Sequence, residues 1–342
     1  MREIQTMSPR QILERAIDAE GGYVNAHAHI DRSHIITPDN WHKTGDSLQQ
    51  KWDYTDHFKR NASVGTILSH MSRVVEDQLE QGVQALGSFI DCDSVVRDKN
   101  IVAAERLRER YGDDIQLVFM NQPIKGLMDK KELQWFDLAS QFVDAIGGLP
   151  ERDGHEDPAQ DKSIEHLDII FDIAAHYNKP LHIHADQLNS PTQRDTEKIL
   201  RHIKARKMIG KVTLIHCISL AAQQKEYRER IYRELKELDV TVVSCPSAWI
   251  DSRRNEVLAP THNASTPVDE MVDAGVRVAI GSDNIADIYK PFSDGNMWTE
   301  LRFLLEANHI YDIDTLAKIA TTHGLRSLEL EQDTAETTQL VA

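Results

Sequence analysis

The 342-residue sequence has only three cysteines, Cys92, Cys217 and Cys245, and no run of about 20 apolar residues. Three cysteines without a regular spacing do not form a disulfide framework, and they suit a reducing compartment. The missing apolar run excludes a membrane-spanning helix. Residues 1–22 carry charges throughout and lack the apolar core of a signal peptide. We therefore expect a cytoplasmic protein with no membrane partner.

Positive charge is also scarce. The chain has 39 lysine and arginine residues against 55 acidic residues, which gives a formal net charge of −16. Such a surface repels phosphate backbones and anionic membranes, so we expect no nucleic-acid partner. A small neutral substrate is compatible with it. Hydrophobic residues make up 40% of the chain, an ordinary share for a globular protein.

Short apolar segments rich in β-branched residues alternate with segments of helical periodicity, such as residues 63–82 and 163–177. The predicted strands are residues 23–28, 83–90, 115–121, 145–149, 180–185, 212–217, 240–245 and 276–283. Strict alternation indicates a parallel sheet, and eight units indicate closure into an α/β fold, the (β/α)₈ TIM barrel. An open doubly wound sheet is the alternative, but no glycine-rich phosphate loop follows the first strand.

No linker, low-complexity tract or repeat divides the chain. We expect a single barrel domain over residues 1–342, with its core over about 20–328 and a flexible tail over 329–342. Residues 312–328 are expected to form one further helix. We expect no β-sandwich side domain. The long connection 37–63 is expected to be a lid over the barrel mouth.

Polar residues stand at the ends of several predicted strands. They are His27, His29, His184, His216 and Asp283. Catalytic groups of such barrels come from the C-terminal ends of the strands. His27 and His29 are two residues apart, so both side chains point to one face of a strand and can bind one ion. Imidazole and carboxylate ligands suit zinc or ferrous iron.

Four segments around these residues resemble the amidohydrolase superfamily, in detail its cytosine deaminase and N-isopropylammelide amidohydrolase branch. The segments are "NAHAHID", "LHIHADQ", "TLIHC" and "GSDNIADIYKP". The resemblance implies one divalent metal ion, zinc or iron, that lowers the pKa of a bound water and yields hydroxide. The implied ligands are His27, His29, His184 and Asp283. His216 and Asp283 are the implied catalytic residues. The fourth strand lacks the lysine of binuclear members, which favours one ion.

Five residues are candidates for substrate binding, of which Gln122 alone is indicated by the resemblance. They are Gln122, Gln187, Arg32, Asn284 and Tyr289. Gln187 stands where the mononuclear deaminases have a proton-shuttling glutamate. Glutamine carries no titrating proton, so the acid–base role falls to His216, Asp283 or both. Arg32 replaces the family's lysine, and it either orients a substrate carbonyl or carboxylate or pairs with Asp31.

These features predict a mononuclear hydrolase that releases ammonia or an amine from a pyrimidine- or triazine-like heterocycle by attack of metal-bound hydroxide. The alternatives are a cyclic amide or lactam hydrolase, a plain cytosine deaminase, and a binding protein that has kept the barrel. We expect a small-molecule heterocyclic substrate and a homo-oligomer. Glu151 or Asp153, after the fourth strand, could reach the rim of the barrel, but a turn with solvated charges is expected there instead.

Overall fold

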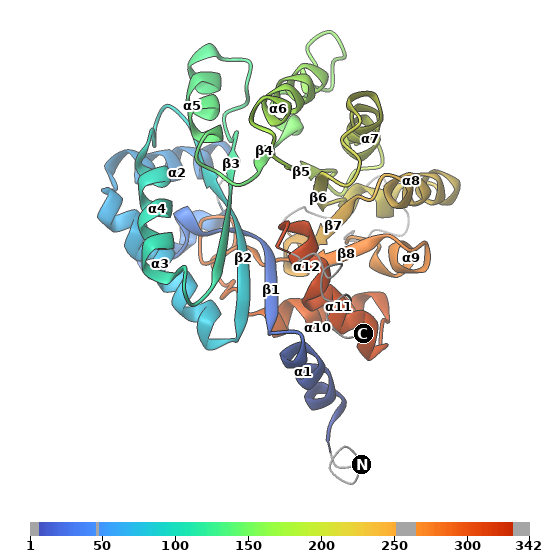
Figure 1. Ribbon diagram of the computed structural model, residues 1–342. Helices are drawn as coiled ribbons and strands as arrows, with labels where there is room; N and C mark the ends of the chain where they lie inside the picture. Colours follow the sequence, from blue (N-terminus) through green and yellow to red (C-terminus); the bar gives the residue numbers. More distant parts are fainter. Residues whose placement is uncertain (1–6, 46–47, 251–264, 331–342) are drawn as a thin grey trace, which may run out of the picture.

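The computed structural model describes residues 7–45, 48–250 and 265–330, with the strands at the centre and the helices around them (Figure 1). The strands are β1 (Tyr23–His29), β2 (Val83–Asp91), β3 (Gln116–Gln122), β4 (Ile146–Gly148), β5 (Leu181–Ala185), β6 (Val212–His216), β7 (Thr241–Ser244), β8 (Arg277–Ile280) and β9 (Asp283–Asn284). The α-helices are α1 (Pro9–Ala19), α2 (Leu48–Asn61), α3 (Val64–Glu80), α4 (Lys99–Tyr111), α5 (Lys130–Ser140), α6 (Ser163–Tyr177), α7 (Asp195–Arg206), α8 (Lys225–Glu237), α9 (Val268–Asp273), α10 (Met297–Asn308), α11 (Ile313–Ala320) and α12 (Thr322–Ser327). Short 3₁₀-helices are η2 (Ile30–Arg32), η3 (Trp41–Gly45), η4 (Pro150–Arg152), η5 (Ile218–Ala222) and η6 (Pro246–Ile250).

The strands form a parallel barrel. Parallel pairing runs β3-β2-β1-β9 on one side and β4-β5-β6-β7-β8 on the other. A parallel bridge between Met120 and Ala145 joins the two runs beside β4. On the opposite side, β9 continues β8 after Gly281 and Ser282 and pairs with β1. The (β/α)₈ barrel predicted from the sequence is confirmed, and the first seven predicted strands begin and end within one residue of the observed ones.

The barrel interior is a buried apolar cluster that is separate from the outer core between strands and helices. Interior members include Val24, Ala26, Ala85, Phe89, Val118, Met120, Ile215, Val243 and Ala279. Leu325 and Leu328, in and just after α12, pack against this cluster. The ring of His182 on β5 contacts the Ser327 carbonyl oxygen through Nε2 at 2.8 Å. Helix α12 therefore fills the N-terminal end of the barrel, which leaves the C-terminal end for the polar residues.

Helix α3 illustrates how the outer layer forms. The Ser63 side chain caps its N-terminus, and Gly82 follows its last turn with a φ of +72°, which glycine adopts without strain. Ile67, Met71 and Val74 are buried at the spacing of one helical stripe. Burial of each such side chain contributes roughly 1.5–3 kcal/mol.

Strand β1 contains a bulge between Asn25 and Ala28, where three residue steps of β1 face two steps of β2. Before the bulge, Val24 lies in the interior cluster, whereas the Asn25 amide hydrogen-bonds outward to Gln78 on α3. The extra residue reverses this alternation, so His27 and His29 point into the barrel. A regular strand with Val24 inside would place both imidazoles outside.

Gly281 permits the close approach of β8 to β1. A Cβ atom at this position would lie 2.7 Å from both the Cβ and the carbonyl oxygen of His27. The Asn25 side chain takes the place of backbone hydrogen bonds between the strands at this point. It accepts from the Ser282 backbone N–H at 3.1 Å and donates to the Ser282 hydroxyl at 2.8 Å. The end of β1 and Asp283 are therefore held side by side.

The single helix predicted over residues 312–328 is wrong, because two helices, α11 and α12, occupy this segment. Thr321 breaks the helix with φ −134° and ψ −94°, and its hydroxyl donates to the Ala317 carbonyl at 2.6 Å. The break lets α12 turn under the barrel. Of the predicted tail over 329–342, residues 331–342 lie outside the described residues. No helix within the described ranges is long and apolar enough to cross a membrane.

Candidate active site

Five polar side chains converge at the C-terminal end of the barrel, as the sequence predicted. Nε2 of His27 and Nε2 of His29 each lie 3.3 Å from Oδ1 of Asp283. The ligand atoms of these three residues lie within 4.8 Å of one another. The same holds for His27, His184 and His216. All five residues are buried, so the cluster forms one compact centre of nitrogen and oxygen donors.

Backbone geometry directs two of these side chains. His216 and Asp283 have φ values of +77° and +60°. These values lie in the left-handed region of backbone conformation, which residues other than glycine rarely adopt. The turn after β6 is held by the Cys217 N–H, which donates to the Ala185 carbonyl at 2.9 Å. Local strain of this kind concentrates at functional sites, where the surrounding fold stabilises it.

Several ring nitrogens in the cluster are buried without hydrogen-bond partners among the described residues. They are both ring nitrogens of His27, Nδ1 of His29 and Nδ1 of His216. In contrast, Nδ1 of His184 lies 3.3 Å from the Gly148 carbonyl oxygen. That contact favours the proton on Nδ1 and leaves the Nε2 lone pair facing the cluster. Buried polar atoms without partners are costly, and a bound cation would satisfy these lone pairs.

The ionisation states suit metal binding. Burial lowers the pKa of His27 to about 4 and that of His216 to about 3, and it lowers the pKa of His184 well below the usual value. Burial of Asp283 opposes its ionisation, but the neighbouring imidazoles of His27 and His29 hold its pKa well below the usual value. Neutral imidazoles and an ionised carboxylate are the forms that ligate a divalent ion. The donor set therefore fits zinc or ferrous iron.

A buried lysine and a buried glutamate lie next to this cluster. Nζ of Lys290 is 4.0 Å from Oδ2 of Asp283 and 3.4 Å from the Ser247 hydroxyl. Glu300 on α10 accepts the Ser247 backbone N–H at 2.9 Å. Burial raises the pKa of Glu300 to about 7. Neither residue stands at the end of a predicted strand, so strand ends alone do not indicate either of them.

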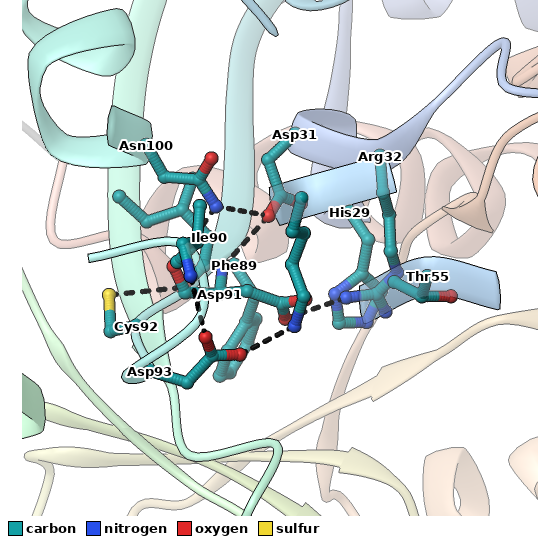
Figure 2. A network of polar contacts seen from close by, with 12 residues as sticks. His29, Asp31, Arg32, Thr55, Phe89, Ile90, Asp91, Cys92, Asp93 and Asn100 are labelled. Atoms are coloured by element: carbon teal, nitrogen blue, oxygen red, sulfur yellow. Dashed lines mark hydrogen bonds and ion pairs between the residues drawn. The ribbon is translucent and has the colours of Figure 1, made fainter. Parts of the chain in front are cut away.

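Arg32 lies beside the cluster in a buried network of ion pairs that reaches α2 (Figure 2). Its NH1 group donates to Oδ1 of Asp91 at 2.7 Å, and Nζ of Lys59 on α2 donates to the other oxygen at 3.2 Å. Nε of Arg32 lies 3.6 Å from Asp287 and has no hydrogen-bond partner in the described part of the chain. The network fixes α2 to the rim of the barrel.

Asp31 is not the ion-pair partner of Arg32 in this network. Its Oδ2 accepts from the Asn100 amide at 2.6 Å and from the Asp91 backbone N–H at 2.9 Å, as Figure 2 shows. The guanidinium contacts the carboxylates of Asp91 and Asp287 instead. Asp91 is the last residue of β2, so its position at a strand end indicates a site residue in the same way as for the histidines. Lys59 carried no comparable signal in the sequence.

A cavity of about 140 Å³ lies between α2 and the barrel rim. Its lining includes Arg32, Trp52, Thr55, Asp91, Arg152 and Tyr289. The guanidinium carbon of Arg152 lies 3.9 Å from the centre of the Trp52 ring, and that of Arg32 lies 5.7 Å from the centre of the Tyr289 ring. The connection 37–63 therefore contributes helix α2 as one wall of this cavity. The cavity lies next to the histidine cluster, because its lining residue Arg32 follows His29 closely in the chain.

The other predicted substrate residues have different environments. Gln122, at the end of β3, is buried, and its Oε1 has no hydrogen-bond partner among the residues described. The Asn284 amide donates to Asp287, so this side chain is engaged within the protein. Asp287 also accepts the Tyr289 backbone N–H at 2.8 Å, which fixes the loop after β9.

Gln187 lies on the connection after β5 and donates to Oε2 of Glu151 at 2.8 Å. The Gln193 amide donates to the same oxygen at 3.1 Å. The prediction that Glu151 and Asp153 lie in a solvated turn is wrong. Helix η4 turns Glu151 towards the connection after β5, where burial raises its pKa. Asp153 contacts Nδ1 of His166 at 2.7 Å and takes part in the packing of α6.

Comparison with known proteins agrees with this fold. The model of the amidohydrolase family matches residues 103–334, so the chain belongs to that family. It is therefore a hydrolase of carbon–nitrogen bonds other than peptide bonds. The similarity extends to the branch that the sequence motifs indicated.

Three relatives define that similarity. An uncharacterized protein of Haemophilus influenzae is 41% identical over 256 residues, which is 74% of this chain and 91% of that protein. N-isopropylammelide isopropyl amidohydrolase of Pseudomonas sp. strain ADP is 26% identical over 341 residues, covering 93% of this chain and 77% of the relative. The crystal structure of 5-methylcytosine deaminase from Klebsiella pneumoniae superimposes with a TM-score of 0.81 at 21% identity, covering 90% of this chain and 74% of the other.

Proposed function

We propose that this protein is a mononuclear metal-dependent hydrolase that releases ammonia or an amine from a nitrogen heterocycle. The observation that carries the proposal is the convergence of His27, His29, His184 and Asp283 at one end of the barrel. Support for the substrate class comes from the relatives, because pterin deaminase and 5-methylcytosine deaminase are named for nitrogen heterocycles. The cavity beside Arg32 has a size suited to part of a small ring.

The four proposed ligands fit one zinc or ferrous ion. Three neutral imidazoles and one carboxylate are donors that such an ion accepts, so these four residues would hold it. When bound, the ion acts as a Lewis acid that favours deprotonation of water near neutral pH. His216 has a ring centroid 5.5 Å from that of His184, and its Nδ1 is unpartnered among the described residues. We assign His216 to the contact with substrate or attacking water rather than to the ligand set.

Other residues would bind the ring. The free acceptor of Gln122 suits a ring N–H group. The unpartnered Nε of Arg32 suits a ring carbonyl oxygen, and the Tyr289 ring lines the same cavity. The Arg32 guanidinium is already held by Asp91, so binding through this group costs little side-chain entropy.

The test is a screen of the metal-loaded protein against pyrimidines, triazines, pterins and hydantoins, with released ammonia and amine measured for each compound. Release from a pyrimidine, triazine or pterin is the expected result, with cytosine a poor substrate. Ring opening of a hydantoin without release of ammonia would replace the proposal with the cyclic amide hydrolase. Cytosine turnover equal to that of any other ring would replace it with a plain cytosine deaminase.

A further inference from the structure

Hydrolysis of the bond between a ring carbon and its amine substituent needs a group that moves one proton. Water adds to the ring carbon and loses a proton, the bond from that carbon to the amine breaks, and the amine nitrogen gains a proton. The products are a ring hydroxyl, which is the tautomer of a ring carbonyl, and a free amine, so one proton of the water stays on its oxygen and the other passes to the leaving nitrogen. A positioned carboxylate performs this transfer efficiently when its pKa lies near the working pH.

Most acids around the site are engaged in ion pairs or structural hydrogen bonds. Asp91 lies between the cations of Arg32 and Lys59. Asp287 accepts the backbone N–H groups of Tyr289 and Lys290. Asp186 accepts the backbone N–H groups at the start of α7. Protonation of any of these carboxylates would break an ion pair or a structural hydrogen bond.

Glu151 differs from these acids because it forms no ion pair and only one of its two carboxylate oxygens accepts a hydrogen bond within the described residues. Oε2 accepts from Gln187 at 2.8 Å and from Gln193 at 3.1 Å, and within the described residues Oε1 takes part in no hydrogen bond. No cation of the described chain lies within ion-pair distance of this carboxylate. Glu151 can therefore gain or lose a proton without the loss of a charged partner. Burial raises its pKa, which brings it closer to neutrality.

The position of Glu151 is also suitable. Strands β4 and β5 are neighbours, with Gly148 paired to Ile183. The Gly148 carbonyl contacts Nδ1 of His184, so the end of β4 touches the proposed metal centre. Glu151 follows Gly148 by one short turn, and Gln187 follows His184 by one short turn. The two side chains meet at 2.8 Å above these strand ends.

We infer that Glu151 is the proton-transferring carboxylate of this enzyme, with Gln187 holding it in place. The inference rests on the proposed function, because it assigns a residue to the same hydrolysis. Gln193 has a separate structural role, since its Oε1 accepts from the Leu188 backbone and the Ser219 hydroxyl. Glu151 takes the proton from the attacking water through one oxygen and delivers it to the leaving nitrogen.

The experiment compares Glu151→Gln with Glu156→Gln, an exposed glutamate on the same connection. The amide introduced by Glu151→Gln can still accept the hydrogen bond from Gln187, so a merely structural role predicts little change. The proton-transfer role predicts a kcat lower by about 10²- to 10⁴-fold in Glu151→Gln, with unchanged metal content and loss of the acidic limb of the pH profile. Glu156→Gln should match the wild type.

A second variant moves the carboxylate. Glu151→Gln combined with Gln187→Glu keeps an amide–carboxylate pair but reverses it, and it should recover at least about tenfold of the lost kcat. In the metal-free protein, infrared titration should detect a carboxyl group with an elevated pKa in the wild type that disappears in Glu151→Gln.

The outcomes separate the two claims. An active wild type with an unchanged kcat and pH profile in Glu151→Gln would refute the role of Glu151 and leave the proposed function standing. A reversed pair that recovers nothing, while folded and metal-loaded, would also refute it. A wild type that releases no amine or ammonia from any ring would refute the proposed function, and the inference with it.

Discussion

Nε2 of His27 lies 3.3 Å from Oδ1 of Asp283, although the two residues come from the first and the last strands of the barrel. Three local features produce this contact: the bulge in β1, the absent side chain at Gly281 and the positive φ of Asp283. Barrel closure and assembly of the site are therefore one event, because the strand pairing that closes the ring also joins the proposed ligands.

The ligand assignment predicts that His184→Ala weakens metal binding by more than about 100-fold, since even outer-sphere partners of metal ligands contribute 10- to 100-fold. Equilibrium dialysis followed by elemental analysis measures this. His176→Ala, at an exposed histidine near the end of α6, is the matched control and should bind metal as the wild type does. Full metal content in a folded His184→Ala protein would remove His184 from the ligand set.

His216→Ala is expected to retain metal and to lose about 10²- to 10⁴-fold in kcat, because a positioned imidazole makes a contribution of that size to proton transfer or to stabilisation of the attacking water. Metal analysis and steady-state kinetics on the same sample check both parts. Loss of the ion together with activity would show instead that His216 is a ligand, consistent with its place among the three converging imidazoles.

Gln187→Glu is expected to lower kcat/KM for the native substrate. The new carboxylate would lie within about 3 Å of Glu151, given the present contact of 2.8 Å, and two carboxylates this close share one proton. The apparent pKa of the pair should rise, which kcat measured between about pH 5 and about pH 9 would reveal. An unchanged pH profile in this variant would contradict the contact between the two side chains.

The raised pKa of the Glu300 carboxyl group predicts that the stability of the protein depends on pH. Its pKa rises from 4.5 to about 7 on burial, so the unfolded chain loses this proton before the folded chain does. The contribution of this group to the free energy of unfolding therefore falls as pH rises from about 4.5 to about 7, by about 3 kcal/mol in total. Glu300→Gln should remove that fall.

Urea unfolding of the metal-free protein at several pH values measures this effect. Glu306→Gln, at an exposed position of the same helix, is the control and should follow the wild type. The difference in stability between Glu300→Gln and the wild type should grow with pH over this interval. A difference that does not vary with pH would show that the Glu300 carboxyl ionises normally in the folded protein.

The sequence was sufficient for the barrel and for the five converging residues, because parallel strands buried on both faces leave clear apolar segments and their C-terminal ends share one rim. It did not reveal the bulge in β1, since pairing register depends on the partner strand. The break at Thr321 was hidden because apolar residues recur on both sides of it, from Leu316 to Leu325.

The residues missed around the site share one property, which is that tertiary contacts decide their role. Glu151 reads as a surface charge until Gln187 and Gln193 are seen to cover it. Lys59 is one of several lysines, and only its contacts with Asp91 and Asp93 distinguish it. Charged residues on connections carry little local signal, whereas histidines inside apolar strands are unusual wherever they occur.

The most direct test of the central claim is release of ammonia or amine from the best heterocycle of the screen, measured before chelation, after removal of metal and after reloading with zinc or ferrous iron. Activity should disappear with the metal and return with about one ion per chain, the number that a single three-histidine, one-carboxylate centre holds. Turnover that persists in the metal-free protein, or that returns only with two ions per chain, would contradict a mononuclear metal-dependent hydrolase.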